Sequence, residues 1–303
     1  ALRFPEFTGE WMKCKFGEIA TGFDYGMNAA AKPYDGQNKY IRITDIDEVS
    51  STYNNSSIVS PDGILSENYV VNEGDILLAR TGASTGKSYL YRKSDGKLYY
   101  AGFLIRANVA EHNPYFVFSQ LHTHRYWRWV SIMSARSGQP GINSLEYASF
   151  PIFTTTLKEE NKISSLLSLI DKRIATQNKI IEDLKKLKSA IRKMIFTSLK
   201  NEHTENCEIN QLLAYEQPSE YIVTNDEYSA DTTLTPVLTA NKGFVLGYTN
   251  ENFGIYKKGE CIIFDDFTMD AKYVSFPFKV KSSAIKILTA KPNVNLRFMF
   301  EYL

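Results

Sequence analysis

The stretch Gly82 to Ser88 (GASTGKS) is the part of the chain whose residue types come nearest to a site for phosphate chemistry. A P-loop needs G-x-x-x-x-G-K-[ST] between a strand and a helix, because glycine amides and a helix N-terminus together hold the phosphates. Here three residues, not four, separate the glycines, and the run that follows, YLYRK, favours a strand. We therefore predict a glycine-rich hairpin tip and not a nucleotide site.

Two interpretations of this tip remain open. It is either a plain surface hairpin with turn glycines, or a loop whose backbone amides can approach a nucleic-acid backbone closely. On the second interpretation Arg80, Ser84, Thr85 and Lys87 supply contacts to phosphates or base edges. The polar loop Ser137 to Asn143 (SGQPGIN) is either a second DNA-facing loop or only a connector.

Other candidate catalytic or metal sites are weak. His122 and His124 lie two residues apart in an expected helix, so they face different sides and do not form the i, i+4 pair that binds metal. The run from Asn113 to Tyr115 (NPY) lacks the second proline of a methyltransferase amino-group motif. We expect neither catalysis nor a bound cofactor. The three acidic residues of a second expected loop are interpreted as loop residues: Asp265, Asp266 and Asp270.

The element that must position these loops is the stretch Leu157 to Leu199, which contains no proline and no glycine. Apolar residues recur in it with a heptad period, which predicts one long helix of about 60 Å with a coiled-coil seam. Thr156 followed by Glu159 fits a capping box at its start. The alternative is a long core helix of one globular domain. The predicted seam comprises Ile163, Leu166, Ile170, Ile180, Leu184, Leu187, Ile191 and Met194.

Charge is distributed unevenly along the 303 residues although the net charge is only +1. Residues 1–150 hold 15 Lys and Arg against 15 Asp and Glu, residues 151–200 hold 11 against 5, and residues 201–303 hold 9 against 14. The basic helix either is a solvated face or faces DNA phosphates or an acidic partner. Three widely spaced cysteines, Cys14, Cys207 and Cys261, are expected to be small core residues in a reducing compartment. The sequence has neither a signal-peptide pattern nor a membrane-length apolar run, so we expect a cytoplasmic protein.

The two flanks of the helix read as mixed α+β and resemble each other. In residues 1–150, strands are predicted at Tyr40 to Ile46, within Val70 to Arg80, at Ser88 to Arg92 and at Phe103 to Val109, with a helix capped by Asn113. Either the second flank is a diverged copy of the first, or the match is a chance alignment of two α+β segments. The predicted equivalences are Gly74 with Gly259, Lys87 with Lys272, Gly86 with Ala271, Ile43 with Leu238, and Asn113 with Asn295.

These features together resemble the specificity subunit of type I restriction–modification enzymes. The resemblance rests on GDILLARTGASTGK (Gly74 to Lys87), on SGQPGIN leading to FPI (Phe150 to Ile152), and on the long helix. It implies two target-recognition domains, at 1–150 and 201–303, which each read half of a split double-stranded DNA sequence, and a helical spacer at 151–200. The second helical region of the family does not follow Leu303 in this sequence, so either the chain is shortened or incompletely represented, or two copies pair through the central helix.

The resemblance further implies a subunit that catalyses nothing. Modification subunits, which bind S-adenosylmethionine, and ATP-dependent restriction subunits would assemble on it. A coiled-coil adaptor without DNA contact is the alternative. The predicted DNA-binding residues are Lys32, Arg42, Arg80, Ser84, Thr85, Lys87, Gln139 and Asn143 in the first domain, and Lys242 and Lys272 in the second.

Overall fold

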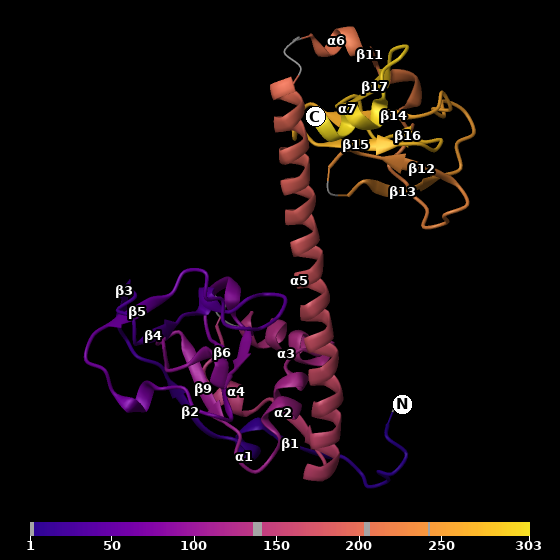
Figure 1. The fold of residues 1–303 in the computed structure, drawn as a ribbon. Helices are drawn as coiled ribbons and strands as arrows, with labels where there is room; N and C mark the ends of the chain where they lie inside the picture. Colours follow the sequence, from indigo (N-terminus) through magenta and orange to yellow (C-terminus); the bar gives the residue numbers. More distant parts are fainter. Residues whose placement is uncertain (1–2, 136–140, 203–206, 242) are drawn as a thin grey trace. The chain divides into compact units, whose positions relative to one another are not determined.

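The computed structural model describes residues 3–135, 141–202, 207–241 and 243–303. It divides into two compact units, residues 1–177 and 178–303, whose boundary falls inside the unbroken helix α5 (Leu157–Glu202) (Figure 1). Helices and several small sheets occur in both units, as the predicted α+β class requires. The three-part division with the helix as a segment of its own stays a prediction.

The first unit is built around a four-stranded antiparallel sheet in the order β2–β9–β6–β7. All five residues of β6 are buried, so this strand forms the centre of the core. The predicted hairpin is confirmed, since β6 and β7 pair with Leu78 opposite Ser88. The bounds are β2 (Thr21–Tyr25), β9 (Leu104–Asn108), β6 (Asp75–Ala79) and β7 (Ser88–Leu90).

Smaller elements complete this unit. The predicted strand at Tyr40 to Ile46 is shorter than expected, because the Asp45 side chain accepts from the Arg42 backbone amide at 2.9 Å and closes a 3₁₀ turn after Ile41. The short strands pair as β1 (Met12–Lys15) with β10 (Pro151–Thr154), β3 (Ala30–Pro33) with β5 (Val59–Asp62), and β4 (Lys39–Ile41) with β8 (Leu98–Tyr100). The 3₁₀ turns are η1 (Ile43–Asp45), η2 (Glu67–Tyr69), η3 (Gly82–Ser84) and η4 (Lys93–Asp95).

The predicted helix after Asn113 begins as expected but is divided into two. The Asn113 side chain accepts from the Phe116 amide at 3.0 Å, with Pro114 in the first turn. Thr123 then caps a second helix by accepting from the Tyr126 amide at 3.3 Å. The helices are α1 (Phe16–Ile19), α2 (Pro114–Gln120), α3 (His124–Ser134) and α4 (Ser144–Ala148).

The start of α5 is fixed to the first unit by two buried carboxylates. Glu160 accepts from the Asn113 amide at 2.9 Å. Glu159 accepts two hydrogen bonds from the Arg3 guanidinium, both at 2.7 Å, and one from the Trp11 indole at 3.1 Å. Thr156 accepts from the Glu159 amide at 3.4 Å, so half of the predicted capping box is present while the Glu159 carboxylate is engaged elsewhere.

The second unit repeats the main sheet, in the order β11–β17–β14–β15. The end of α5 packs on its last helix, where the Phe196 ring lies 5.4 Å from Phe298 and 5.2 Å from Tyr302. The elements are α6 (Ile209–Leu212), β11 (Leu213–Glu216), η5 (Ser219–Tyr221), β12 (Thr235–Leu238), β13 (Val245–Thr249), β14 (Cys261–Asp265), β15 (Ala271–Val274), β16 (Lys279–Val280), β17 (Ile285–Ala290) and α7 (Leu296–Tyr302).

The strand register bears out the internal repeat. Leu77 pairs with Arg106 in the first unit, and the residues that the sequence aligns with them, Ile262 and Leu288, pair in the second. At the next hairpin the equivalence of residues between the two units shifts by one. Leu78 lies opposite Ser88, whereas its equivalent Ile263 lies opposite Lys272, so the equivalence of Lys87 with Lys272 is wrong by one residue. The second hairpin connection is one residue shorter, and Gly86 therefore corresponds to Asp270 and not to Ala271.

A second predicted equivalence shifts in the same way. The Ala101 amide donates to the Ile41 carbonyl, and the Lys281 amide donates to the Leu238 carbonyl. Both pairs belong to short parallel ladders, β4 with β8 and β12 with β16. Leu238 is thus the counterpart of Ile41, two residues before the Ile43 that the sequence suggested.

The second unit contains a buried ion pair. The Lys279 ammonium is fully buried, 2.6 Å from the Glu251 carboxylate and 3.0 Å from the Phe253 carbonyl. Burial alone would raise the pKa of Glu251, but hydrogen bonds from Lys279 and Thr224 outweigh it and lower the pKa to about 2. Removing either partner would leave a buried charge unpaired, which is strongly destabilising.

The cysteines are not all core residues. Cys261 is buried, which raises the pKa of its thiol to about 12, and Cys14 is partly buried. Cys207 is exposed, so the core prediction is wrong for it, because it lies before α6 on no buried face. Across the described ranges, every helix is too short or too polar to cross a membrane.

Candidate nucleic-acid interface

The structure brings together two loops that are some sixty residues apart in the sequence. Thr81 forms an isolated antiparallel bridge with Gly141, and the Ile142 amide donates to the Arg80 carbonyl at 2.9 Å. The glycine-rich tip and the end of the SGQPGIN loop therefore form one surface. A depression of about 250 Å³ lies between them, lined by Arg80, Thr81, Met133, Gly141, Ile142, Asn143 and Glu146.

Arg80 is held in place from two sides. Its guanidinium carbon lies 4.6 Å from the centroid of the Tyr25 ring, and its backbone amide donates to the Phe103 carbonyl at 3.0 Å. The Tyr25 hydroxyl accepts from the Ser144 amide at 3.3 Å, and hydrogen bonds with the side chain and then the backbone of Ser144 lower the pKa of Tyr25. Sequence reasoning missed Tyr25, because this residue of β2 lies far from Arg80 in the sequence and no local motif marks it.

The two glycines of the tip have different roles. Gly82 has a φ of +68° with open space around the position of a Cβ. Gly86 has a φ of +91°, and a Cβ there would lie 2.7 Å from Val130. The Tyr126 hydroxyl donates to the Gly86 carbonyl at 2.8 Å. Only the Gly82 side of the tip is therefore open to a ligand, since the Gly86 side is part of the core.

The polar residues within the tip are used mainly by the tip itself. Thr85 is buried, and its hydroxyl donates to the Gly82 carbonyl at 2.8 Å. The Ser84 carbonyl accepts from the Lys87 amide at 3.0 Å, while the Ser84 side chain is partly exposed. A DNA contact through Thr85 requires the loop to open, whereas Ser84 is available without any rearrangement.

Three of the predicted cationic residues already have acidic partners. Arg42 makes a two-pronged pair with Asp45 at 2.7 and 2.8 Å. The Lys87 ammonium lies 2.7 Å from Glu48, and the Lys87 side chain is only 17% exposed. For Lys32, which is exposed, the Asp62 carboxylate lies 3.9 Å away. A phosphate must compete with these carboxylates, most strongly at Arg42.

Asn143 has a structural task as well. It caps α4 by accepting from the Glu146 amide at 2.9 Å, and the Glu146 carboxylate accepts from the Asn143 amide at 2.8 Å. This reciprocal pair is a capping box and fixes the rim of the depression. Two further predicted contact residues, Gln139 and Lys242, lie outside the described residues.

The corresponding hairpin of the second unit has a different tip. Asp265 accepts from the amides of Phe267 and Thr268 at 2.9 and 3.0 Å and so folds the connection tightly. Phe267 and Met269 are 85% and 70% exposed, and Lys272 on β15 is partly exposed. The frame is shared between the units while the chemistry of the tip changes from glycine and hydroxyl groups to apolar and acidic ones.

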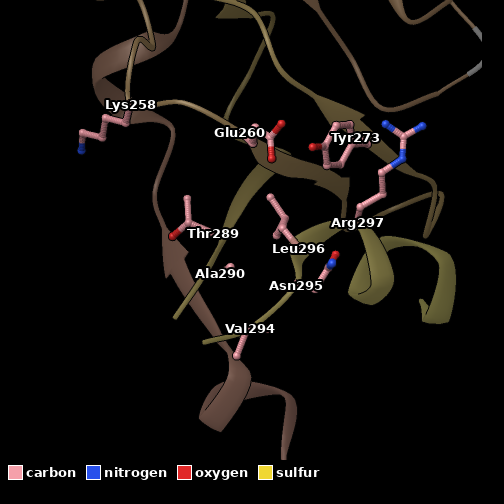
Figure 2. A pocket seen from close by; sticks show the side chains of 9 residues that line it. All are labelled: Lys258, Glu260, Tyr273, Thr289, Ala290, Val294, Asn295, Leu296 and Arg297. Carbon is pink, nitrogen blue, oxygen red and sulfur yellow. The ribbon is translucent and has the colours of Figure 1, made fainter. Parts of the chain in front are cut away.

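A larger depression of about 700 Å³ lies beside the start of α7 in the second unit (Figure 2). Its charged side chains are mostly paired. Lys258 lies 2.6 Å from Glu216, and the Arg297 guanidinium stacks 5.2 Å from the Tyr273 ring. A hydrogen bond with Glu260 raises the pKa of Tyr273. None of the described residues forms a cluster of His, Cys, Asp or Glu able to hold a metal ion.

The predicted seam of α5 is exposed. From Leu166 to Met194 its apolar members are 44–66% exposed, although Ile163 is partly buried. The basic residues near the helix end are partly neutralised, because Lys188 and Arg192 lie 3.0 and 3.3 Å from Glu301. The helix thus presents an exposed apolar stripe with coiled-coil spacing.

Comparison with known protein families identifies the family of this chain. Residues 9–186 match the model of the type I restriction modification DNA specificity domain, which is more than half of the chain and includes both loops and most of α5. The chain belongs to this family. As a specificity-domain protein, it shares with its family the mixed α/β fold and the long helix described above.

The chain is also similar to several individual proteins. The specificity subunit of the Escherichia coli type I restriction enzyme EcoR124I/EcoR124II is 52% identical over 84 residues, which is 27% of this chain and only 20% of that subunit. The crystal structure of the S subunit from M. genitalium has a TM-score of 0.68 at 13% identity, covering 96% of this chain and 76% of that one. The HsdS subunit from Thermoanaerobacter tengcongensis has a TM-score of 0.41 at 13% identity, covering 99% and 80%.

Proposed function

We propose that this chain is a non-catalytic subunit that reads a bipartite sequence in double-stranded DNA for a type I restriction–modification system. The observation that carries this proposal is the single surface formed by the Arg80–Gly82 and Gly141–Asn143 loops in a member of a DNA specificity family. Loops on a rigid sheet can differ in sequence while the frame is kept, which suits a protein that must read different DNA sequences.

We assign the two reading heads to residues 1–150 and 201–303, and the spacer to residues 151–200. The matching strand registers of the two sheets support a duplicated reading head. An unbroken helix of 46 residues supports a spacer that sets the distance between two half-sites. Phosphate contacts would supply most of the affinity, so binding would fall steeply as salt rises.

We further propose that the exposed stripe of α5 binds other protein chains. The partners would be the modification subunits, which bind S-adenosylmethionine and methylate the DNA, and the ATP-dependent restriction subunits that join them. Pairing of two copies through the same stripe is the alternative use. The exposure of its apolar side chains supports both, because contiguous exposed apolar surface marks interaction sites.

Two experiments test these assignments. A mobility-shift titration with random duplexes at low and at moderate salt should show binding that weakens as salt rises. Absence of binding at low salt would leave only the role of a coiled-coil adaptor. In cells that express the modification subunits, mapping methylated adenines with and without this chain should reveal one split motif that depends on it, and no such motif would contradict the proposal.

A further inference from the structure

We infer that the depression beside Gly82 recognises a G·C base pair in the major groove, with Arg80 contacting the guanine and Glu146 the cytosine. This inference rests on the proposed function and adds to it the base pair and the two side chains that select it. It depends on three features: an unpaired fork of donors, a fixed carboxylate, and the position of both side chains in one depression.

The first feature is the state of Arg80. Within the described part of the chain, no acidic side chain pairs with its guanidinium, in contrast to Arg42 and Lys87, whose charges are taken by Asp45 and Glu48. Arg80 is instead stacked on Tyr25 and anchored through both its backbone amide and its carbonyl. Stacking leaves the in-plane N–H donors of the guanidinium free.

The second feature is the orientation of Glu146. Its Oε2 atom accepts from the Asn143 amide at 2.8 Å, which fixes the carboxylate at the start of α4. No second hydrogen bond to this carboxylate comes from the other residues that the structure describes. Among the described residues, the other carboxylate oxygen has no donor, so it can accept a hydrogen bond at the rim of the depression while the bond from Asn143 restrains the side chain.

The third feature is the pairing of these two groups. Arg80 and Glu146 line the same depression, yet they are not among the ion pairs formed by the described residues. Guanine presents two acceptors, O6 and N7, to the major groove, and the cytosine paired with it presents the N4 amino donor beside them. An arginine fork matches the first pattern and a carboxylate matches the second. An A·T pair offers the fork one acceptor and one donor instead, so the preference for G·C should be about tenfold or more.

The test is selection of bound duplexes from a randomised pool with the full chain and with three variants. Arg80→Lys keeps the charge but loses the fork. Glu146→Gln keeps the capping box, in which glutamine serves as well as glutamate, but removes the carboxylate. Lys32→Ala is the matched control, since it removes an exposed cation of the same unit that does not line the depression.

The wild-type chain should select a motif with a G·C pair at a position where both Arg80→Lys and Glu146→Gln lower the preference about tenfold. The other positions should not change, and Lys32→Ala should weaken binding while keeping the motif. If both variants select the wild-type motif, or if the affected position is not G·C, the inference is overturned while the proposed function stands. If the wild-type chain selects no motif, both fail. Unchanged thermal denaturation of each variant shows that a lost preference is not caused by unfolding.

Discussion

Asn113 and Asn295 occupy the same position in the two units: each caps a short helix by accepting a hydrogen bond from the backbone amide three residues on. Their surroundings differ. Asn113 also accepts from the Ser164 hydroxyl at 2.8 Å and donates to Asn161 at 2.7 Å, and both partners lie on α5. The same cap therefore also joins α2 to the long helix in the first unit.

Asn113→Ala should consequently lower the free energy of unfolding more than Asn295→Ala does. Loss of a cap destabilises by about 1 kcal/mol, and the additional bonds to α5 should add about another 1 kcal/mol in the first unit. Hydrogen exchange at the amides of Phe116 and Phe298 measures the two effects separately. Equal losses in both units would contradict a joining role for Asn113.

Gly86→Ala should destabilise the first unit by about 2 kcal/mol or more, because a methyl group there meets Val130 and Trp127 and the backbone is left-handed. Gly82→Ala is the matched control, with a positive φ but open space, and should cost about 1 kcal/mol. Urea denaturation compares them. If Gly82→Ala proves the more damaging, the packing around Gly86 has been misjudged.

Stability should depend on Glu159 in acid. Hydrogen bonds from Arg3, and secondarily from Thr155 and Trp11, lower the pKa of Glu159 from its usual 4.5 to about 2. A carboxylate whose pKa is lowered by folding stabilises the folded state at pH values above its pKa in the unfolded state. This contribution is lost as the pH falls towards 2. The difference in unfolding free energy between wild type and Glu159→Gln should thus be constant above about pH 5.5 and shrink below it. A difference independent of pH would show that Glu159 is not ionised in the folded protein.

Lys87→Ala should weaken binding to all duplexes alike and reduce the salt slope by about one unit, as expected for a phosphate contact. Because Glu48 holds the ammonium at 2.7 Å, Glu48→Gln should have the opposite effect and raise affinity at low salt. Both are measured by titration at several salt concentrations. Should neither variant change the slope, Lys87 is only a partner of Glu48.

Replacing Leu184 and Leu187 together by serine should leave thermal stability almost unchanged, since both side chains are more than half exposed. Binding of the modification subunits, or pairing of two copies, should weaken at least tenfold, because two seam positions lose their apolar surface. Sedimentation velocity measures both kinds of assembly. Lys179 lies outside the seam, so Lys179→Ser is the control and should not change either kind of assembly.

Local patterns predicted much of this fold. A turn followed by a continuous apolar run located β6, a strand-like run located β9, and the Asn-Pro pair located the start of α2, since these signals act within a few residues. The division between α2 and α3 was missed because apolar residues recur on both sides of Thr123, and a capping threonine is not distinguished from a helical one there. The misaligned Lys272 has a similar cause: the two hairpin connections differ by one residue, which only strand pairing reveals.

The candidate site was predictable only in part. The glycine tip and the polar loop were both noticed, but their bridge between Thr81 and Gly141 depends on how the chain folds back. The partner of Arg42 is three residues away and could have been inferred, whereas Glu48 lies 39 residues from Lys87. Tyr25 lacked any signal, because an exposed tyrosine on a strand is ordinary until a guanidinium is found above it.

The common register of the two central sheets has a practical consequence. In both units the hairpin connection leaves one buried strand and returns on a neighbour with equivalent pairing, so a loop cut at Ala79 and Lys87 has the same anchor points as one cut at Phe264 and Ala271. Grafting the second segment into the first unit would keep these strand pairs, but it would place Asp270 where Gly86 packs against Val130, so the grafted loop needs a glycine at that position.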